Sequence, residues 1–185
     1  MNDYPKIANL KGVYVPREDS FLLADAVEKY AFGKVLDIGT GTGILGIIAA
    51  RKGCEVTFAD IDDGAIRCAK ANAKANLVGG DFVISDMFSN IDGLFNTIIF
   101  NPPYLDSEAL EKLKCRDLAL DGGEGGRELI DLFLSQYKNH LLKKNIVLLL
   151  ESSLNGYEND VRALNAELVG TAELFFETIA VLMLK

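Results

Sequence analysis

The chain has 185 residues, with 19 Lys and Arg against 27 Asp and Glu, so its formal charge at pH 7 is −8. The length predicts a single domain. A composition of 49% hydrophobic and 25% charged residues excludes intrinsic disorder and collagen-like repeats. The longest apolar run, residues 179–184, is far shorter than the roughly 20 residues that cross a bilayer. The N-terminus has no apolar signal core, so we expect a cytoplasmic protein without membrane association.

Charge and residue types narrow the chemistry further. A negative chain gains little attraction to nucleic-acid backbones, which disfavours nucleic-acid binding by this chain alone. Cys54, Cys68 and Cys115 are odd in number, lie far apart and form no CxxC pair, so we expect a reducing compartment and no disulfide framework. The only histidine, His140, is predicted to be a surface or half-buried residue near a helix end. We therefore expect no zinc site and no Cys–His catalytic pair.

Segments with strand and helix patterns alternate along the chain, which predicts an α/β protein with a doubly wound, mostly parallel sheet. The expected helices are 18–30, 44–52, 62–76, 127–141 and 155–166, and the expected strands are 34–38, 55–59, 82–85, 95–100, 145–150, 168–176 and 178–184. A short extended segment, 12–16, precedes the first helix. A polar stretch of unusual length, 105–126, follows the fourth strand, and such loops are typically functional or mobile. The last two strands are expected to be antiparallel to each other.

A glycine-rich turn follows the first predicted strand. Asp37 to Gly43 reads DIGTGTG and leads into a helix, where glycines permit a close approach of the backbone to a ligand. Asp60 ends the next strand, 21 residues after Gly39, at the place where a carboxylate typically binds the hydroxyls of a ribose. Asp86 follows the third strand. Because ligands of such sheets bind at the carboxyl ends of the strands, the sequence predicts a nucleotide-like ligand there.

Two cofactors fit this frame, and a glycine turn without a ligand is a third interpretation. Residues 41–46 match GxGxxG, the pattern of dinucleotide-binding proteins, which alone is a weak signal. Asp37 argues against a dinucleotide, because a carboxylate suits the α-amino group of a methionine moiety better than a pyrophosphate. The spacing favours S-adenosylmethionine (SAM) over NAD.

The segment Asn101-Pro102-Pro103-Tyr104 directly follows the fourth strand. Two prolines could simply end the strand and an aromatic ring could cover it, but that leaves Asn101 unexplained. The Asn101 side-chain carbonyl and the Pro102 backbone carbonyl can both accept hydrogen bonds from a planar nitrogen. Tyr104 can stack on a flat amide or base. We expect this segment to orient an amide or amino nitrogen for methylation.

These motifs resemble those of class I SAM-dependent methyltransferases. Three further segments resemble the HemK/PrmC family, the glutamine N5-methyltransferases of translation release factors: YVPREDSFLL at 14–23, the DID ending at 60–62, and ALDGGEGGR at 119–127. The resemblance covers nearly the whole chain. It implies a Rossmann-like seven-stranded sheet with one antiparallel strand near the C-terminus, in one domain spanning 1–185, with a lead-in and helix at 1–32 and a catalytic core at 33–185.

The resemblance also assigns roles to residues. Asn101, Pro102 and Tyr104 are implied to be catalytic, and Pro103, Tyr104, Gly122 and Gly123 to bind the substrate. Asp60 is implied to hold the ribose, Asp86 the adenine amino group, and Met87 to supply a backbone donor, while Tyr14 and residues 18–20 close over the methionine end. The full set implied for SAM, with S-adenosylhomocysteine as product, is Ser20, Asp37, Gly39, Gly41, Gly43, Asp60, Asp86, Met87 and Asn101; no metal is implied.

The N-terminus departs from the bacterial pattern, because only about a dozen residues precede Tyr14. The chain resembles the short archaeal and eukaryotic form, which works with a small zinc-binding activator subunit. We expect residues 82–85 to form an apolar edge strand that could pair with such a partner. The leading hypothesis is methylation of the Gly-Gly-Gln glutamine of a class 1 release factor. Methylation of adenine N6, guanine N2 or protein lysine stays open, as does a SAM-binding subunit without catalysis.

Overall fold

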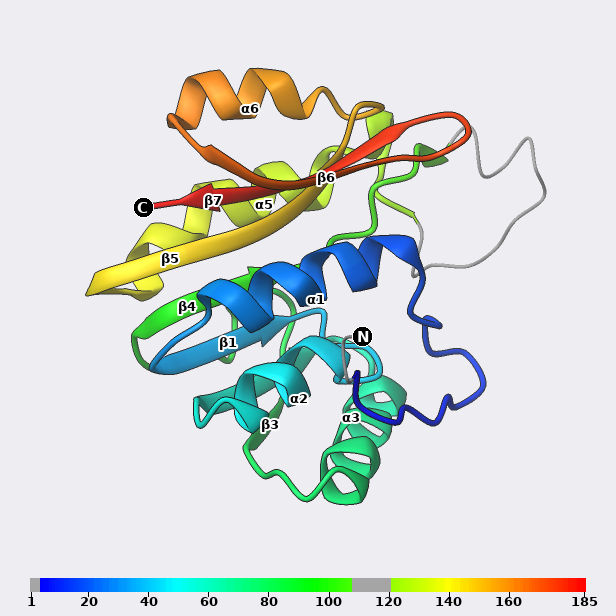
Figure 1. Cartoon of the computed structure of the whole chain (residues 1–185), viewed down its shortest axis with the longest axis vertical. Coiled ribbons are helices and arrows are strands. Elements are labelled where there is room, and N and C mark those ends of the chain that lie inside the picture. Colours follow the sequence, from blue (N-terminus) through cyan, green and yellow to red (C-terminus); the bar gives the residue numbers. More distant parts are fainter. Residues whose placement is uncertain (1–3, 108–120) are drawn as a thin grey trace.

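The computed structural model describes residues 4–107 and 121–185. Within these residues the chain forms one seven-stranded sheet in the order β3-β2-β1-β4-β5-β7-β6. All neighbouring strands are parallel except β7, which is antiparallel to both β5 and β6. The structure thus confirms the predicted mostly parallel sheet with one antiparallel strand near the C-terminus (Figure 1). Cys115 and the first residues of the 119–127 motif lie outside the described residues.

The elements follow the expected alternation of strand and helix. In chain order they are α1 (Glu18–Tyr30), β1 (Lys34–Ile38), α2 (Ile44–Arg51), β2 (Glu55–Asp60), α3 (Asp63–Ala75), β3 (Asp81–Ile84), β4 (Phe95–Phe100), η1 (Glu124–Gly126), α5 (Glu128–Gln136), η2 (Tyr137–His140), β5 (Leu141–Ser152), α6 (Tyr157–Leu164), β6 (Glu167–Glu173) and β7 (Thr178–Leu184). The predicted bounds of α1, β1, β4 and β7 are confirmed to the residue.

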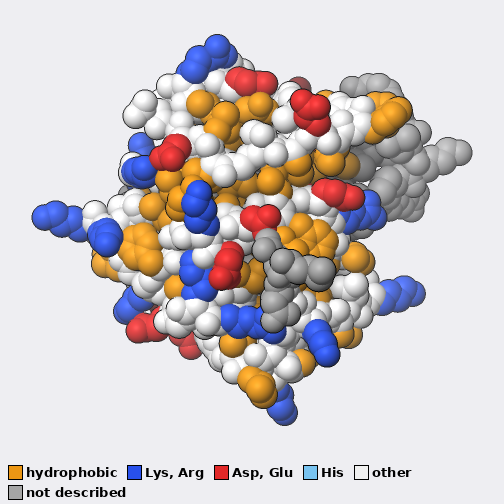
Figure 2. Space-filling model, in the orientation of Figure 1, with side chains coloured by type: hydrophobic (Ala, Val, Ile, Leu, Met, Phe, Trp, Pro, Cys, Tyr) orange, Lys and Arg blue, Asp and Glu red, His pale blue; other side chains and the backbone are white. Residues whose placement is uncertain are grey.

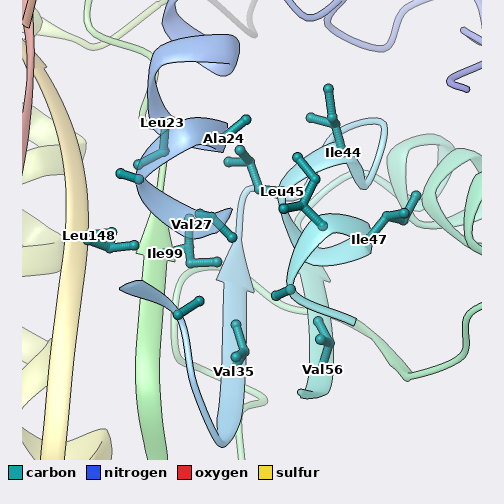
Figure 3. Packing of buried hydrophobic residues seen from close by; sticks show 14 of the residues in the cluster. Leu23, Ala24, Val27, Val35, Ile44, Leu45, Ile47, Val56, Ile99 and Leu148 are labelled. Carbon is teal, nitrogen blue, oxygen red and sulfur yellow. The ribbon is translucent and has the colours of Figure 1, made fainter. Parts of the chain in front are cut away.

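Helices cover both faces of the sheet, because the buried strands are apolar on both sides. The helices α1, α2 and α3 cover one face, and α5 and α6 cover the other (Figure 1). On the first face, Leu23 and Val27 of α1 lie beside Ile99 and Leu148 of the sheet, as Figure 3 shows. Successive strand residues serve opposite faces: Leu148 belongs to the first core and Leu149 to the second.

Three predicted elements differ from the structure by more than two residues at one end, and five others differ by one or two. The helix expected at 127–141 ends at Gln136, continues as one 3-10 turn, and gives way to β5 at Leu141. The strand expected at 145–150 left the polar residues Lys143 and Lys144 outside it. Instead, β5 begins before these residues. Phe95 of β4 pairs with Leu141 and Thr97 with Ile146, so the polar residues between them lie in an irregularity of the pairing, where the register shifts.

The strand expected at 168–176 also differs. It begins at Glu167 and ends at Glu173, and a hydrogen bond from the Leu174 N–H to the Glu177 carbonyl closes the turn to β7. Phe175 and Phe176 lie in this turn and are 90% and 85% exposed, so their apolar character indicated strand wrongly. None of the helices in the described ranges is both long enough and apolar enough to cross a bilayer.

Candidate active site

A cavity of about 560 Å³ opens at the carboxyl ends of β1, β2, β3 and β4. This size lies within the range of about 300–1,000 Å³ that is typical of small-molecule sites. Its wall combines the start of the chain, the glycine turn after β1, the ends of β2 and β3, and the segment after β4. The polar and catalytic candidates among the lining residues are Tyr14, Asp19, Ser20, Gly39, Thr40, Gly41, Asp60, Asp62, Asp86, Met87, Asn101, Pro102, Pro103 and Tyr104.

The glycine turn after β1 brings the backbone against the cavity. Gly39 and Gly41 have φ angles of +63° and +53°, which favour glycine. The Gly41 N–H donates a hydrogen bond of 2.9 Å to Asp60 Oδ2, so the turn is tied to the end of β2. The result is a floor of exposed backbone beside a carboxylate.

Asp60 is held in a defined orientation by backbone donors. Its Oδ2 accepts the Gly41 bond, and its Oδ1 accepts a bond of 3.0 Å from the Asp62 N–H. Burial raises the pKa of Asp60 above its ordinary value, and these hydrogen bonds oppose the rise. Each oxygen keeps a further lone pair, so the carboxylate can accept bonds from two ligand hydroxyls.

Asp37 lies behind the cavity wall instead of in it. The residue is fully buried, and its Oδ2 accepts bonds from Thr40 Oγ1 (2.6 Å) and the Gly46 N–H (3.0 Å). Its Oδ1 is buried and has no hydrogen-bond partner among the described residues. Burial raises the pKa of Asp37 to about 7, against the opposing effect of the Thr40 and Gly46 bonds. The site therefore holds a carboxyl group whose protonation is poised near neutrality.

The turn after β3 contributes Asp86 and Met87. Asp86 is exposed, whereas Met87 is buried and has a φ of +46°, which is unusual for a non-glycine residue. The Ser85 hydroxyl donates to the Met87 carbonyl at 2.9 Å and holds this conformation. Backbone strain of this kind clusters at ligand sites.

Asn101, at the end of β4, is oriented by the start of α1. Its Nδ2 donates to Asp19 Oδ2 at 3.1 Å and to Ser20 Oγ at 3.5 Å. The Asp19 carboxylate also accepts bonds from the Ser20 N–H (2.6 Å) and the Tyr14 hydroxyl (3.0 Å). Asn101 Oδ1 is buried without a partner among the residues that the structure describes. The side chain is thus satisfied on its donor side and open on its acceptor side.

Tyr104 lies in the cavity wall beside these groups. Burial and the Asp19 carboxylate raise the pKa of its phenol, so the ring stays neutral at physiological pH. Behind it, the Gly122 N–H donates to the Leu105 carbonyl at 2.8 Å, and a Cβ at Gly122 would lie 2.7 Å from the Pro103 carbonyl oxygen. The residues from Asp121 onward therefore brace the segment after β4.

The structure brings most of the predicted site residues together, but four do not line the cavity: Asp37, Gly43, Gly122 and Gly123. Gly43 caps α2 and packs against Ala69 of α3, where a Cβ would lie 3.0 Å from the Ala69 backbone. Gly122 and Gly123 pack behind the cavity, against Pro103 and Glu128. The role of Asp19 in holding Asn101 was not anticipated. Its only sequence signal is its place in the 14–23 segment.

The charge of the lining selects the kind of ligand. It contains four carboxylates, Asp19, Asp60, Asp62 and Asp86, and no Lys or Arg among the described residues. Such a site repels a pyrophosphate and attracts a cation. Together with the unpartnered oxygen of Asn101, this matches a ligand that carries a sulfonium, an amine and a ribose. The predicted preference for SAM over a dinucleotide fits these residues.

His140 is half-buried and stacks on Phe88 at 4.5 Å between ring centroids, at the end of the 3-10 turn. This confirms the predicted structural position. Cys54 and Cys68 are free cysteines. In the part of the chain that the structure describes, no group of three or more His, Cys, Asp and Glu side chains could hold a metal ion.

Comparison with known proteins gives consistent matches. The family model "Methyltransferase small domain" matches residues 6–120. A protein of Methanocaldococcus jannaschii with the provisional name protein N5-glutamine methyltransferase is 42% identical over 154 residues, which are 82% of this chain and 78% of that protein. The ribosomal RNA small subunit methyltransferase C of Buchnera aphidicola is 41% identical over 52% of this chain, but the match spans only 30% of that relative's length.

Solved structures share the fold. The 16S rRNA N2 methyltransferase of T. thermophilus, in complex with AdoMet and guanosine, has a TM-score of 0.69 and 20% identity, and the match covers 93% of this chain and 43% of that one. The ribosomal protein L11 methylase of Lactobacillus delbrueckii has a TM-score of 0.64 and 20% identity, with coverage of 98% and 90%. At these identities the likeness concerns the fold.

Proposed function

The chain belongs to the methyltransferase small domain family and is a SAM-dependent methyltransferase, and we propose that it methylates the side-chain amide nitrogen of a glutamine. The acceptor is the glutamine of the Gly-Gly-Gln segment in a class 1 translation release factor. The observation that carries this proposal is Asn101, whose donor side is bonded to Asp19 while its buried Oδ1 has no partner among the described residues. That oxygen can accept a hydrogen bond from an N–H group of the substrate.

SAM, when bound, supplies a methyl group on a sulfonium, which is electrophilic without further activation. The residues of this chain hold and orient it. Asp60 would accept hydrogen bonds from the ribose hydroxyls, and the Gly39–Gly41 turn would let the backbone approach closely. Asp86 and Met87 would hold the adenine. Asp19, and Asp37 in its ionised form, would place negative charge near the α-amino and sulfonium groups and so stabilise the cationic cofactor.

The acceptor amide is a poor nucleophile, because its lone pair is delocalised into the carbonyl. Asn101 is barely basic, so it orients the nitrogen and stabilises charge without removing a proton. As the new N–C bond forms and the C–S bond breaks, the surplus proton of the amide would pass to water. Its Oδ1 and the Pro102 carbonyl accept the two amide N–H bonds, and the Tyr104 ring stacks on the amide plane. Fixed acceptors of this kind stabilise the positive charge that grows on nitrogen during transfer.

A protein substrate is favoured over a nucleic-acid base. The cavity lining carries four carboxylates and, among the described residues, no cation that could bind a phosphate. On the face seen in Figure 2, Lys and Arg side chains are scattered among Asp and Glu and form no continuous basic stripe. The N5-glutamine relative matches most of both chains, whereas the rRNA relative matches 30% of its own length. Methylation of a guanine amino group is the second candidate, favoured by that partial match.

We further propose a cytoplasmic protein that works with a small zinc-binding activator subunit. β3 is an edge strand of the described sheet, and its last residue, Ile84, is 49% exposed. An exposed apolar edge strand can pair with a strand of another chain. A pull-down of tagged protein from its native host that yields no small co-purifying protein would argue against this partner.

The proposal is tested by methyl transfer from labelled SAM to purified release factor, tRNA and rRNA in parallel, with and without a co-purified partner. We expect label on the glutamine of the release factor. Asn101→Ala should lower turnover by about 100-fold or more while SAM still binds, and Asn159→Ala, an exposed asparagine on α6, should transfer normally. Label on nucleic acid alone would overturn the glutamine assignment, and normal turnover by Asn101→Ala would overturn the mechanism.

A further inference from the structure

Asn155, in the turn between β5 and α6, ties together three segments that lie far apart in the sequence. Its Nδ2 donates to the carbonyl oxygens of Tyr104 at 2.8 Å, Gly125 at 3.1 Å and Gly126 at 3.2 Å. The bond to Tyr104 spans 51 residues and grips the backbone of the Asn-Pro-Pro-Tyr segment. Asn155 itself does not line the cavity, so any effect on the reaction passes through Tyr104.

The Tyr104 carbonyl is also contacted by Gly126. Gly126 has a φ of +66°, and a Cβ at this position would lie 2.1 Å from the Tyr104 oxygen. No side chain could occupy that space, so the backbones of residues 104 and 126 are in direct contact. The Asn155 amide lies on the same side, because a Cβ at Gly126 would also lie 2.5 Å from Asn155 Nδ2. Gly126 and Asn155 thus both contact the Tyr104 backbone from this side.

Asn155 is itself anchored to the sheet. Its N–H donates to the Ser152 carbonyl at 3.0 Å, and its own carbonyl accepts a bond from Arg127 Nη1 at 3.3 Å. Arg127 also forms ion pairs with Glu151 at 3.2 Å, with Asp131 at 2.7 Å and with Asp160. Glu151 is fully buried at the end of β5. Through Asn155 and Arg127, the backbone of Tyr104 is therefore connected to the end of β5.

We propose that Asn155 is a positioning residue for methyl transfer, which holds the Tyr104 backbone so that the Tyr104 ring and the Pro102 carbonyl meet the acceptor nitrogen in the reactive geometry. The assignment rests on the proposed function of the Asn-Pro-Pro-Tyr segment. A displacement of about 1 Å at a reacting centre can cost about a hundredfold in rate. Asp60 ends β2, and Asp86 and Met87 lie in the turn after β3, so we expect SAM binding to be independent of Asn155.

The test uses Asn155→Asp, which keeps the shape of the side chain and removes its donors. A carboxylate facing the carbonyls of residues 104, 125 and 126 cannot donate to any of them. Asn159→Asp is the matched control, because it makes the same charge change at an exposed position four residues away. Asn155→Ala removes the donors without adding charge. All variants are compared with the wild type, each in complex with any co-purified partner.

Three quantities are measured: kcat with whichever acceptor the wild type methylates, the dissociation constant of SAM, and the exchange of the backbone amides in residues 101–107, of which Pro102 and Pro103 carry none. We expect both Asn155 variants to lower kcat about tenfold or more, to leave SAM affinity within about twofold, and to speed exchange in 101–107. Asn159→Asp should match the wild type in all three. Unchanged kcat and exchange in Asn155→Asp would overturn the proposal. A loss of SAM affinity as large as the loss of kcat would also overturn it, because it indicates a purely structural role.

The exchange measurement separates this proposal from the proposed function. If the wild type methylates nucleic acid and not the release factor, the substrate assignment fails, but the kcat comparison on that acceptor still decides the role of Asn155. If the wild type methylates none of the three acceptors, exchange decides alone. Faster exchange confined to 101–107 then supports the positioning role, and exchange equal to that of the wild type overturns it.

Discussion

The Asp19 carboxylate lies 3.1 Å from Nδ2 of Asn101, across 82 residues of sequence. A carboxylate can only accept hydrogen bonds, so it fixes which end of the Asn101 amide faces α1 and which faces the cavity. The amide nitrogen turns toward Asp19, and the carbonyl oxygen has no partner in the described ranges, 4–107 and 121–185. A buried oxygen without a hydrogen bond costs about 1–3 kcal/mol, and an N–H group of the bound substrate can recover this energy. The first turn of α1 thus prepares Asn101 for its acceptor role.

Replacing Asp19 with Asn should impair catalysis without unfolding the protein. The new amide can present either its oxygen or its nitrogen to Asn101, so the Asn101 side chain loses its fixed orientation. We expect kcat to fall about tenfold to a hundredfold, measured by steady-state methyl transfer. Glu28→Gln is the control, because it removes a negative charge from an exposed position on the same helix. Equal kinetics for Asp19→Asn and Glu28→Gln would mean that Asp19 does not orient Asn101.

Asp60→Asn should weaken cofactor binding specifically. The variant keeps the size of the side chain, but one of the two oxygens that accept bonds from Gly41 and Asp62 becomes a donor. Loss of a hydrogen bond to a charged group costs about 1.5–3 kcal/mol, so the dissociation constant of SAM should rise by about one to two orders of magnitude. Calorimetric titration measures it, and Asp92→Asn, at an exposed carboxylate, serves as control. A dissociation constant that stays at the wild-type value would exclude the ribose role.

SAM binding should release protons near neutral pH. Burial raises the pKa of Asp37 from 3.8 to about 7, so the fold favours the neutral acid, and its ionisation costs the ligand-free protein stability as the pH rises between these values. A cation bound nearby favours the carboxylate and lowers that pKa. At a pH close to 7, SAM binding should therefore release up to about half a proton from Asp37, with none released by about pH 9.

Calorimetry in buffers of different ionisation enthalpy measures this release. Asp60 also has a raised pKa and contributes its own protons, so the comparison with Asp37→Asn isolates Asp37. The variant should release fewer protons at pH 7, and SAM should bind the wild type more weakly as the pH falls below about 7. The same proton count in both proteins would show that Asp37 does not sense the cofactor.

The sequence predicts the strands and helices where local signals agree. α1 and β4 match to the residue, because the apolar spacing of a helix runs from Phe21 to Tyr30 and the apolar run of β4 stops at Phe100, before Asn101 and the two prolines. Prediction fails where apolar residues serve another purpose. Phe175 and Phe176 are apolar, which favoured a longer β6, but they lie exposed in a tight turn. The hydrogen bond from Leu174 to Glu177 closes this turn, and the apolar pattern of the sequence gives no sign of it.

The sequence likewise predicts some residues of the candidate site and misses the contacts of others. Residues that end strands, such as Asp60, Asp86 and Asn101, meet at one cavity because parallel strands place their carboxyl ends on one edge. The function of Asp19 depends on a contact with Asn101 that only the packing of α1 against the sheet creates. The resemblance assigns Gly122 to the substrate, whereas the structure shows a packing reason for the glycine, because a Cβ there would lie 2.7 Å from the Pro103 carbonyl oxygen.

Gly46 of α2 tests the packing behind the site. In an exposed helix position, alanine is more stable than glycine by about 0.5–1 kcal/mol. At Gly46 the sign should reverse, because a Cβ would lie 2.3 Å from the Phe58 ring and 3.0 Å from Asp37 Oδ2. Gly46→Ala should therefore lower the free energy of unfolding by about 1–3 kcal/mol, which denaturant titration measures. Gly79→Ala, where no atom lies within 4 Å of the new Cβ, should leave stability unchanged or raise it. If Gly46→Ala were as stable as Gly79→Ala, α2 would have room to move away from β2, and Asp37 would not be held as tightly as its bonds to Thr40 and Gly46 require.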